Sequence, residues 1–118
     1  MIIAVPLDEN KLDICPSFGR APYFLIRNTE SGQTDILENP AAQAEGGAGL
    51  QAAQFVADQN AQALITFRCG ENAAEVLKAA DVVIYKAEGS DAETNLAAQK
   101  EGKLAELTHF HAGFHGIR

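Results

Sequence analysis

ALITFRCGENAAEVLKAADVVIY, residues 63–85, is the stretch that decides the fold class of this 118-residue chain. It begins and ends with continuous apolar runs, residues 63–67 and 82–85, which are typical of strands buried on both faces of a parallel sheet. Between the runs, small and apolar side chains recur at helical spacing: Ala73, Val76, Leu77 and Ala80. A strand, a helix and a second strand in this order predict a right-handed crossover within an α/β domain.

The rest of the chain supplies three further strands and two further helices. Residues 1–5 form another continuous apolar run, and residues 23–27 and 34–38 are joined by turn-forming residues typical of an antiparallel hairpin. Helices are predicted from about residue 50 to 60 and from residue 90 to near Gly102. We therefore predict an α/β fold with a five-stranded mixed sheet and helices on both faces.

Helix ends and buried faces are predicted from capping boxes and apolar spacing. A cap residue followed three positions later by Glu occurs twice: Asn72 with Glu75, and Ser90 with Glu93. The side chains predicted to face inward from the first and third helices are Leu50, Ala53, Ala57, Leu96 and Ala97. The strand residues predicted to form the core are Ile2, Ala4, Leu64, Ile65, Val83 and Ile84.

Composition and charge exclude several classes of protein. A hydrophobic fraction of 47% indicates a folded globular domain. Sixteen acidic against nine basic residues give a net charge of −7, and the bases are spread along the chain, so we expect no nucleic-acid partner. No apolar run approaches the ~20 residues of a membrane span, and two distant cysteines cannot build a disulfide framework. We therefore expect a cytoplasmic protein with no membrane partner, present as a monomer or weak homodimer.

The motifs of common enzymes do not occur in the sequence. GxSxG, HExxH and the calcium-binding EF-hand loop are missing. A two-metal nuclease would need acidic residues along its first strand, whereas residues 2–5 read IIAV and supply none. The glycine-rich loop has no positioned acid–base pair beside it. We therefore expect a protein that is not an enzyme.

The loop over residues 7–22 is long for a hairpin connection, and ordered loops of this length are often functional. One interpretation is an ordinary surface loop in which Cys15 packs as a small hydrophobic side chain. The other is a reactive thiolate whose charged form is favoured by the nearby Arg20. The residues of this loop leave both interpretations open.

Two further turns contain glycine. Residues 46–49, GGAG, precede a helix, so their N–H groups either bind an anion at the positive end of the helix dipole or form a flexible entry turn. Cys69 and Gly70 follow a predicted buried strand, at the edge where ligands gather in α/β sheets, and Cys69 is either a ligand or an inert half-buried thiol. If residues 1–5 and 63–67 are parallel neighbours, the loop over residues 7–22 faces Cys69.

The last residues form a histidine-containing segment. Residues 108–118 include His109, His111 and His115 with glycines and no periodicity, so we predict a mobile tail after a domain of residues 1–107. The imidazoles either lie free in solvent or chelate a borderline or soft metal.

Several segments together resemble one known family. In chain order they are IIAVP (2–6), FGRAPYFLI (18–26), ENPAA (38–42), GGAGLQAAQ (46–54), CGENAAEVL (69–77), YKAEG (85–89) and EGKL (101–104). With them the chain resembles the dinitrogenase iron–molybdenum cofactor biosynthesis family, the NifX/NifB C-terminal-like proteins. The resemblance implies a ribonuclease H-like fold without the nuclease acids. It also implies a role in binding, carrying or transferring an iron–sulfur or iron–molybdenum cluster between donor and acceptor proteins.

The resemblance and the residues together define a predicted site. The family usually has His directly before FGR, and that position is Ser17 here, with Cys15 two residues earlier as the local replacement. The predicted cofactor-binding residues are Cys15, Ser17, Phe18, Gly19, Arg20, Gly46, Gly47, Ala48, Gly49, Cys69 and Gly70. The predicted metal ligands are Cys15, Cys69, His109, His111 and His115. The alternative hypothesis is a metal-free regulatory or protein-interaction module on the same fold.

Overall fold

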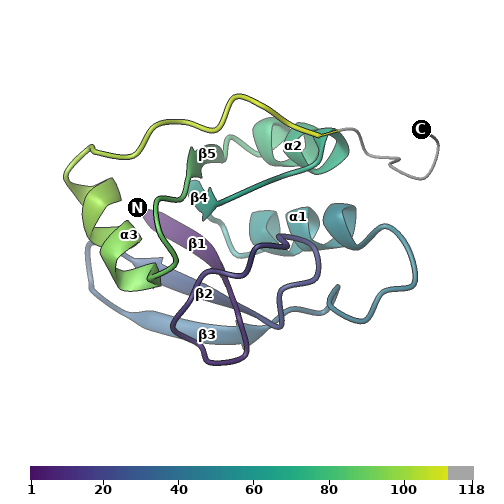
Figure 1. Cartoon of the computed structure of the whole chain (residues 1–118). Helices are drawn as coiled ribbons and strands as arrows, with labels where there is room; N and C mark the ends of the chain where they lie inside the picture. Colours follow the sequence, from purple (N-terminus) through teal and green to yellow (C-terminus); the bar gives the residue numbers. More distant parts are fainter. Residues whose placement is uncertain (112–118) are drawn as a thin grey trace.

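The computed structural model describes residues 1–111 as five strands and three helices (Figure 1). The strands are β1 (Ile2–Leu7), β2 (Tyr23–Asn28), β3 (Thr34–Glu38), β4 (Ala63–Thr66) and β5 (Val83–Lys86). The helices are α1 (Ala48–Asp58), α2 (Glu71–Ala79) and α3 (Ala92–Lys100). Within residues 1–111, no helix is long and apolar enough to cross a membrane.

The strands form one mixed sheet in the order β3-β2-β1-β4-β5. β1 pairs antiparallel with β2, and β2 pairs antiparallel with β3. The pairings of β1 with β4 and of β4 with β5 are parallel. The predicted five-stranded mixed sheet is therefore confirmed. Because β1 and β4 are parallel neighbours, their carboxyl ends lie at the same edge of the sheet, and the segments that follow them meet there.

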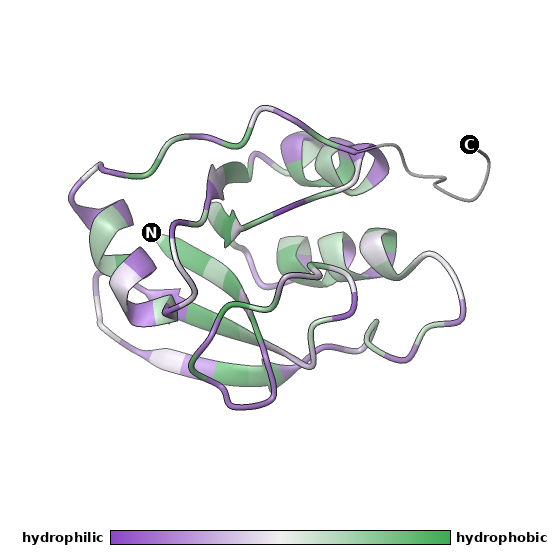
Figure 2. Ribbon diagram, viewed as in Figure 1, coloured by the Kyte–Doolittle hydropathy of each residue, from purple (hydrophilic) through white to green (hydrophobic). Residues whose placement is uncertain are grey.

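Helices cover both faces of the sheet, as predicted. Successive residues of a strand point to opposite faces, and in β1 Ala4 packs with α1 and α2 whereas Ile3 and Val5 pack with α3. α1 and α2 lie side by side on one face, and α3 lies on the other (Figure 1). β1 is apolar along its length (Figure 2). Burial on both faces explains why its apolar run is continuous.

The predicted core is confirmed in part. Ala4, Leu64, Ile65 and Ile84 are buried and Ile2 is half-buried. The prediction for Val83 is wrong, because its side chain is 38% exposed. Val83 pairs with Ala63 and faces the side of the sheet that α3 covers. α3 packs on β1, β2 and β4, so this end of the edge strand β5 has no helix over it.

The ends and faces of the helices differ from several predictions. α2 begins at Glu71 after Gly70, so Asn72 lies inside the helix and does not cap it. The cap of α3 is Asp91, one residue after the predicted Ser90, and its carboxylate accepts hydrogen bonds from the backbone N–H and the hydroxyl of Thr94. Leu50 is 44% exposed in the first turn of α1.

Alanines, two larger aliphatic residues and one amide fill the buried positions of α1 and α3. In α1 the buried residues are Ala48, Ala52, Ala53 and Val56. In α3 Ala97 is exposed, contrary to prediction, and the buried positions are Ala92, Asn95 and Leu96. The Asn95 side chain donates to the carbonyls of Glu88, Gly89 and Asp91 and accepts from the Glu88 N–H, so its burial is compensated by hydrogen bonds.

The chain after α3 runs along the outer edge of β5 and on to α2 (Figure 1). The Lys86 N–H donates to the Ala105 carbonyl at 2.8 Å, and the Leu107 N–H donates to the Ile84 carbonyl at 2.8 Å. Residues 108–111, assigned to a mobile tail from the sequence, continue this path and reach the turn at Gly70. Residues 112–118, the rest of the predicted tail, lie outside the described residues.

Candidate functional site

A cavity of about 610 Å³ opens at the edge of the sheet where β1 and β4 end. Its wall is built from the loop at residues 16–20, the start of α1 at residues 47–50, residues 68–70 after β4, the first turn of α2, and His111. The predicted convergence of the loop after β1 with the Cys69 turn is therefore present. The start of α1, which follows the hairpin in sequence, completes the wall between them.

Asn39, a buried residue between β3 and α1, holds the loop in place. Its side-chain amide donates to the carbonyls of Gly19 and Ala21 at 3.1 and 2.9 Å, and its side-chain oxygen accepts from the Ala41 N–H at 3.0 Å. Three hydrogen bonds offset the cost of burying this amide. Asn39 lies in the segment ENPAA, where its position directly before a proline indicates a turn, but no local pattern of residues predicts that its side chain anchors the loop.

Arg20 also ties the loop to the segment that precedes α1. Its guanidinium donates to the Ala44 carbonyl at 2.6 Å and to the Ala42 carbonyl at 3.4 Å, and its backbone N–H donates to the Ser17 hydroxyl oxygen at 3.3 Å. These contacts place Arg20 at the cavity wall with a structural task. Of the two interpretations of Cys15, the thiolate favoured by Arg20 gains no support, because the groups that shift the pKa of Cys15 are its burial, Ser17 and Asp8.

Cys15 lies just outside the cavity wall, which begins at Pro16. Its N–H donates to the Pro6 carbonyl, and its side chain is buried. Burial is the main cause that raises the pKa of the Cys15 thiol, and the negative charge of Asp8 adds to it, while a hydrogen bond from the Ser17 backbone opposes both. The thiol is therefore protonated at neutral pH, as expected for a cysteine packed as a small hydrophobic side chain.

Gly19 and Gly49 bring the loop and α1 into backbone contact. A Cβ atom added to Gly19 would lie 2.8 Å from the Gly49 nitrogen and 3.0 Å from its Cα, so only glycine allows this approach. The predicted glycine-rich entry to the helix is thus used for close packing as well as for the turn, where Gly47 has a φ of 69°. Gly46 does not line the cavity, whereas Gly47, Ala48 and Gly49 do.

Two helices start at the cavity, and glycine is the N-cap residue of each. α1 follows Gly47 and α2 follows Gly70, so neither has a side-chain cap from its own N-cap residue. In α1 the first intrahelical bond runs from the Gln51 N–H to the Gly47 carbonyl, so the N–H groups of residues 48–50 have no acceptor inside the helix, and these three residues belong to the cavity wall. In α2 the Glu71 N–H donates to the His111 carbonyl at 2.9 Å.

Cys69 lies in the wall and is 1% exposed. Burial raises the pKa of its thiol to about 11, and the positive charge of Lys78 opposes this shift only in part. A metal that binds this sulfur must therefore displace its proton. Arg68 also belongs to the cavity wall, although it was not among the predicted site residues. Its position directly before Cys69, close to the end of a predicted strand, could have indicated that it lies at the site.

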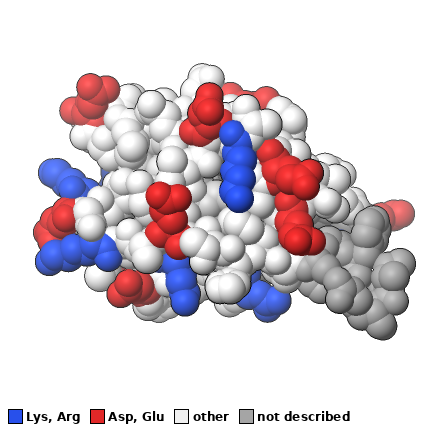
Figure 3. Space-filling model, turned by 90° about the horizontal axis from the view of Figure 1, so that it is seen from above, with Lys and Arg blue, Asp and Glu red and all other residues white. Residues whose placement is uncertain are grey.

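The structure separates the predicted residues into two groups. Those at the cavity are Ser17, Phe18, Gly19, Arg20, Gly47, Ala48, Gly49, Cys69, Gly70 and His111. Cys15, Gly46 and His109 are outside its wall, and His115 lies beyond the described residues. In residues 1–111, no three side chains of His, Cys, Asp or Glu come together as a set that could hold a metal ion. On the face seen in Figure 3, acidic and basic side chains are interspersed.

Comparison with known proteins identifies the family. The model of the family described as dinitrogenase iron–molybdenum cofactor matches residues 1–102. An uncharacterized protein of Methanocaldococcus jannaschii is 34% identical over 110 residues, which cover 91% of this chain and 92% of that protein. A Thermotoga protein of the DUF35 family, put forward as a NifB protein, has a solution structure that is 38% identical with a TM-score of 0.78, covering 92% of this chain and 95% of that one.

A second solved structure is similar over the same length. The apo form of the orange protein from Desulfovibrio gigas is 27% identical with a TM-score of 0.83, covering 91% of this chain and 92% of that one. The lining segments FGR, GGAG and CGEN fall inside the range that the family model matches, whereas His111 of the cavity wall lies beyond that range. The chain therefore belongs to the dinitrogenase iron–molybdenum cofactor family.

Proposed function

We propose that this protein is a non-catalytic accessory protein that binds, carries or transfers an iron–sulfur or iron–molybdenum type cluster as its cargo. The family and the solved relatives support a role in iron–molybdenum cofactor biosynthesis or in the handling of metal clusters. We place the cargo in the cavity between the loop at residues 16–20, the start of α1 and the Cys69 turn. Its partners in this proposal are cluster donor and acceptor proteins.

The single observation that carries the proposal is the composition of the cavity wall. Cys69 supplies a soft sulfur and His111 an imidazole, while Arg20 and Arg68 supply positive charge. The N-termini of α1 and α2 add the positive ends of two helix dipoles. Metal–sulfur clusters bind to thiolates and are usually anionic, so soft ligands and positive charge in one cavity match their chemistry.

The residues fit a cluster that is held loosely. A resident iron–sulfur cluster usually has four cysteine ligands, whereas the cavity wall contains one cysteine, Cys69. Cys15 directly precedes Pro16, the first residue of the wall. We propose Cys69 as the main ligand, His111 as the second and Cys15 as an additional candidate. So few strong ligands favour transfer to a partner over permanent storage. The strand order and directions also lead us to propose the ribonuclease H-like assignment for the sheet.

Anaerobic reconstitution tests the proposal. The purified protein is incubated with iron, sulfide and molybdate, separated from excess reagents, and examined by metal analysis and visible absorption. We expect the parent protein to retain metal and sulfide with a cluster absorption band, and Cys69→Ser to retain less than half of the parent's metal. Cys15→Ser is the comparison variant: because Cys15 is buried outside the wall, we expect a smaller loss than for Cys69→Ser.

Two results would contradict the proposal. If Cys69→Ser holds as much cluster as the parent, the cargo does not bind in this cavity. If the parent retains no metal under any of these conditions, the metal-free interaction module becomes the better hypothesis.

A further inference from the structure

The segment after α3 connects the outer edge of the sheet with the cavity. We call residues 104–111 the strap. Its first part is fixed at β5 by the two backbone hydrogen bonds of 2.8 Å described above, and the Leu104 side chain is buried in the core on the α3 side. From there the strap passes α2 and ends at the Gly70 turn (Figure 1). The strap thus has a firm attachment far from the cavity and a second contact at its wall.

The second contact is made by Phe110 and His111. The Phe110 ring is half-buried against the core that α1 and α2 share, with the Lys78 ammonium 4.4 Å from its centroid. The His111 N–H donates to the Cys69 carbonyl at 3.3 Å, which is longer than the bonds at β5. The contacts that hold this end of the strap include the Phe110 ring, this long hydrogen bond and the bond from Glu71.

The bond from Glu71 uses a group that an anion would need. Glu71 is the first residue of α2, and its N–H has no acceptor inside the helix. The His111 carbonyl accepts from it at 2.9 Å and so serves as a backbone cap for α2. An anionic cargo that approaches the start of α2 must compete with this carbonyl for the same N–H.

We propose that Phe110 and His111 form a latch that closes the cavity by capping α2, that cargo must displace the His111 carbonyl from α2 to bind, and that the His111 imidazole ligates the cargo only after this displacement. The strap stays attached at β5 while its end swings away from the Gly70 turn. This inference rests on the proposed function, since the cargo is the cluster proposed above. The observed affinity for cargo is then the affinity of the open state multiplied by the fraction of molecules in which the latch is open.

Gly70 offers a way to open the latch without changing the strap. A Cβ atom added to Gly70 would lie 3.2 Å from the His111 ring, while the φ of −74° at Gly70 suits any residue. Gly70→Ala therefore pushes on His111 without straining the backbone at residue 70. Phe110→Ala removes the ring that anchors the latch. His109→Ala is the matched control, because His109 belongs to the strap but is exposed and outside the cavity wall.

Two measurements test the latch without any cargo. Alkylation by iodoacetamide, followed by mass spectrometry, compares Cys69 at the cavity with buried Cys15 as the internal reference. We expect Gly70→Ala and Phe110→Ala to raise the Cys69 rate relative to Cys15 at least about threefold, and to speed amide exchange at Glu71 and His111. His109→Ala should match the parent. The latch is refuted if both variants are folded by circular dichroism and yet neither changes the ratio of the Cys69 and Cys15 alkylation rates or the amide exchange at Glu71 and His111.

Reconstitution then separates the latch from the proposed function. With iron, sulfide and molybdate, we expect Gly70→Ala to load at lower reagent concentrations than the parent, because its cavity is open more often. If the parent loads but Gly70→Ala does so no more readily despite faster alkylation of Cys69, the competition is refuted and the proposed function stands. If neither protein loads, the proposed function and the competition both fail, while alkylation and exchange still decide whether the latch closes the cavity.

Discussion

At the scale of single residues, the cavity depends on groups whose surroundings are unusual. Cys69 keeps its proton well above neutral pH because it is buried, and Gly19 lies where no side chain fits. Both properties come from neighbours that are distant in sequence. Cys69 is packed in the core that α1 and α2 share, and Gly49 is the neighbour that excludes a side chain at Gly19.

The raised pKa of Cys69 predicts how stability depends on pH. The ordinary pKa is 9.0 and the folded value is about 11, so the folded protein binds this proton more tightly than the unfolded chain. Below pH 9 the effect on stability is fully present, and it is lost as pH rises from about 9 towards 11. We expect the free energy of unfolding to fall over this range by more in the parent than in Cys69→Ala. Urea titrations of both proteins at several pH values measure the difference, and parallel curves would contradict the assignment.

Gly19→Ala tests the backbone contact that shapes the cavity. The new methyl group would meet the Gly49 nitrogen at 2.8 Å, so the loop or α1 must move. We expect a loss of about 1 to 3 kcal/mol in the free energy of unfolding, measured by urea denaturation. Gly46→Ala is the control, because a Cβ atom there meets nothing within 4 Å, and it should be close to neutral. Equal effects of the two substitutions would show that the Gly19 contact is unimportant.

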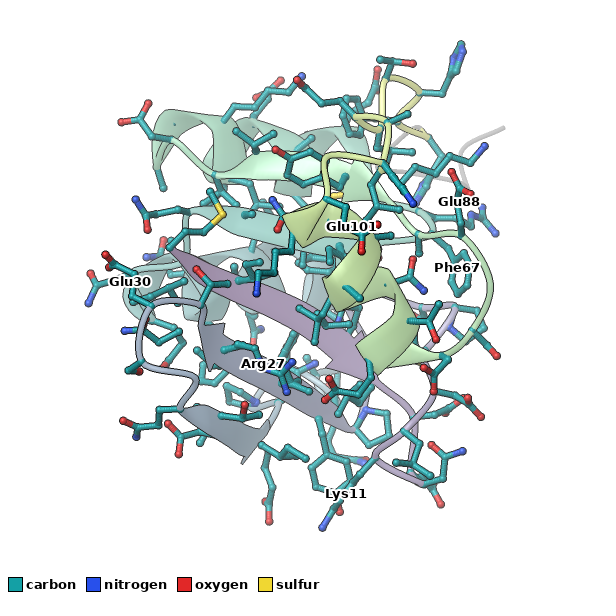
Figure 4. The ribbon with its side chains drawn as sticks, turned by 90° about the vertical axis from the view of Figure 1, so that its left-hand side faces the viewer. Lys11, Arg27, Glu30, Phe67, Glu88 and Glu101 are labelled. Atoms are coloured by element: carbon teal, nitrogen blue, oxygen red, sulfur yellow. The ribbon has the colours of Figure 1, made fainter. Side chains whose placement is uncertain are left out.

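At the scale of elements, α3 is fixed by side chains at its own start. Asp91 caps it, and Arg27 of β2 holds Glu93 through two hydrogen bonds of 2.8 and 2.6 Å. Figure 4 shows Arg27 beside this helix. The hydrogen bond from Arg27 is the main cause that holds the pKa of Glu93 below its usual range. In α1 and α2, by contrast, the N-cap residue is a glycine, and the cavity lies at the N-termini of these two helices.

Asp91→Ala should therefore destabilise the protein. The substitution removes the acceptor for the N–H and the hydroxyl of Thr94, so the free energy of unfolding should fall. Ser90→Ala, which alters the residue predicted as the cap from the sequence, should change stability by less than about 0.5 kcal/mol. Thermal or urea unfolding of the two variants distinguishes the caps. A larger loss for Ser90→Ala would reverse this assignment.

At the scale of the whole molecule, stability comes from two cores on opposite faces of one sheet. Ile65 is fully buried in the core under α3, whereas Val83 on the edge strand is 38% exposed although it faces the same side. We expect Ile65→Ala to lower the free energy of unfolding by about 2 to 5 kcal/mol, because it leaves a cavity in a packed layer. Val83→Ala, the control, should cost less than about 1 kcal/mol. Similar losses for both variants would contradict the packing described for β5.

The sequence by itself determined the order of strands and helices, the mixed sheet and the family. Continuous apolar runs such as residues 63–67 and helical spacing such as that of Ala73 and Leu77 are local patterns, so they can be read without knowledge of distant contacts. Sequence also predicted that the loop after β1 would meet the Cys69 turn, because that follows from the direction of two strands.

Only the tertiary structure decided which of these residues share the cavity. Cys15 and Cys69 looked equivalent as candidate ligands, yet Cys69 lies in the wall and Cys15 is packed just outside it. The bonds of Arg20 to Ala42 and Ala44, the anchoring of the loop by Asn39 and the capping of α2 by His111 join residues 18 to 40 positions apart. Such contacts depend on how the elements pack in space, and no local pattern of residue types encodes that packing.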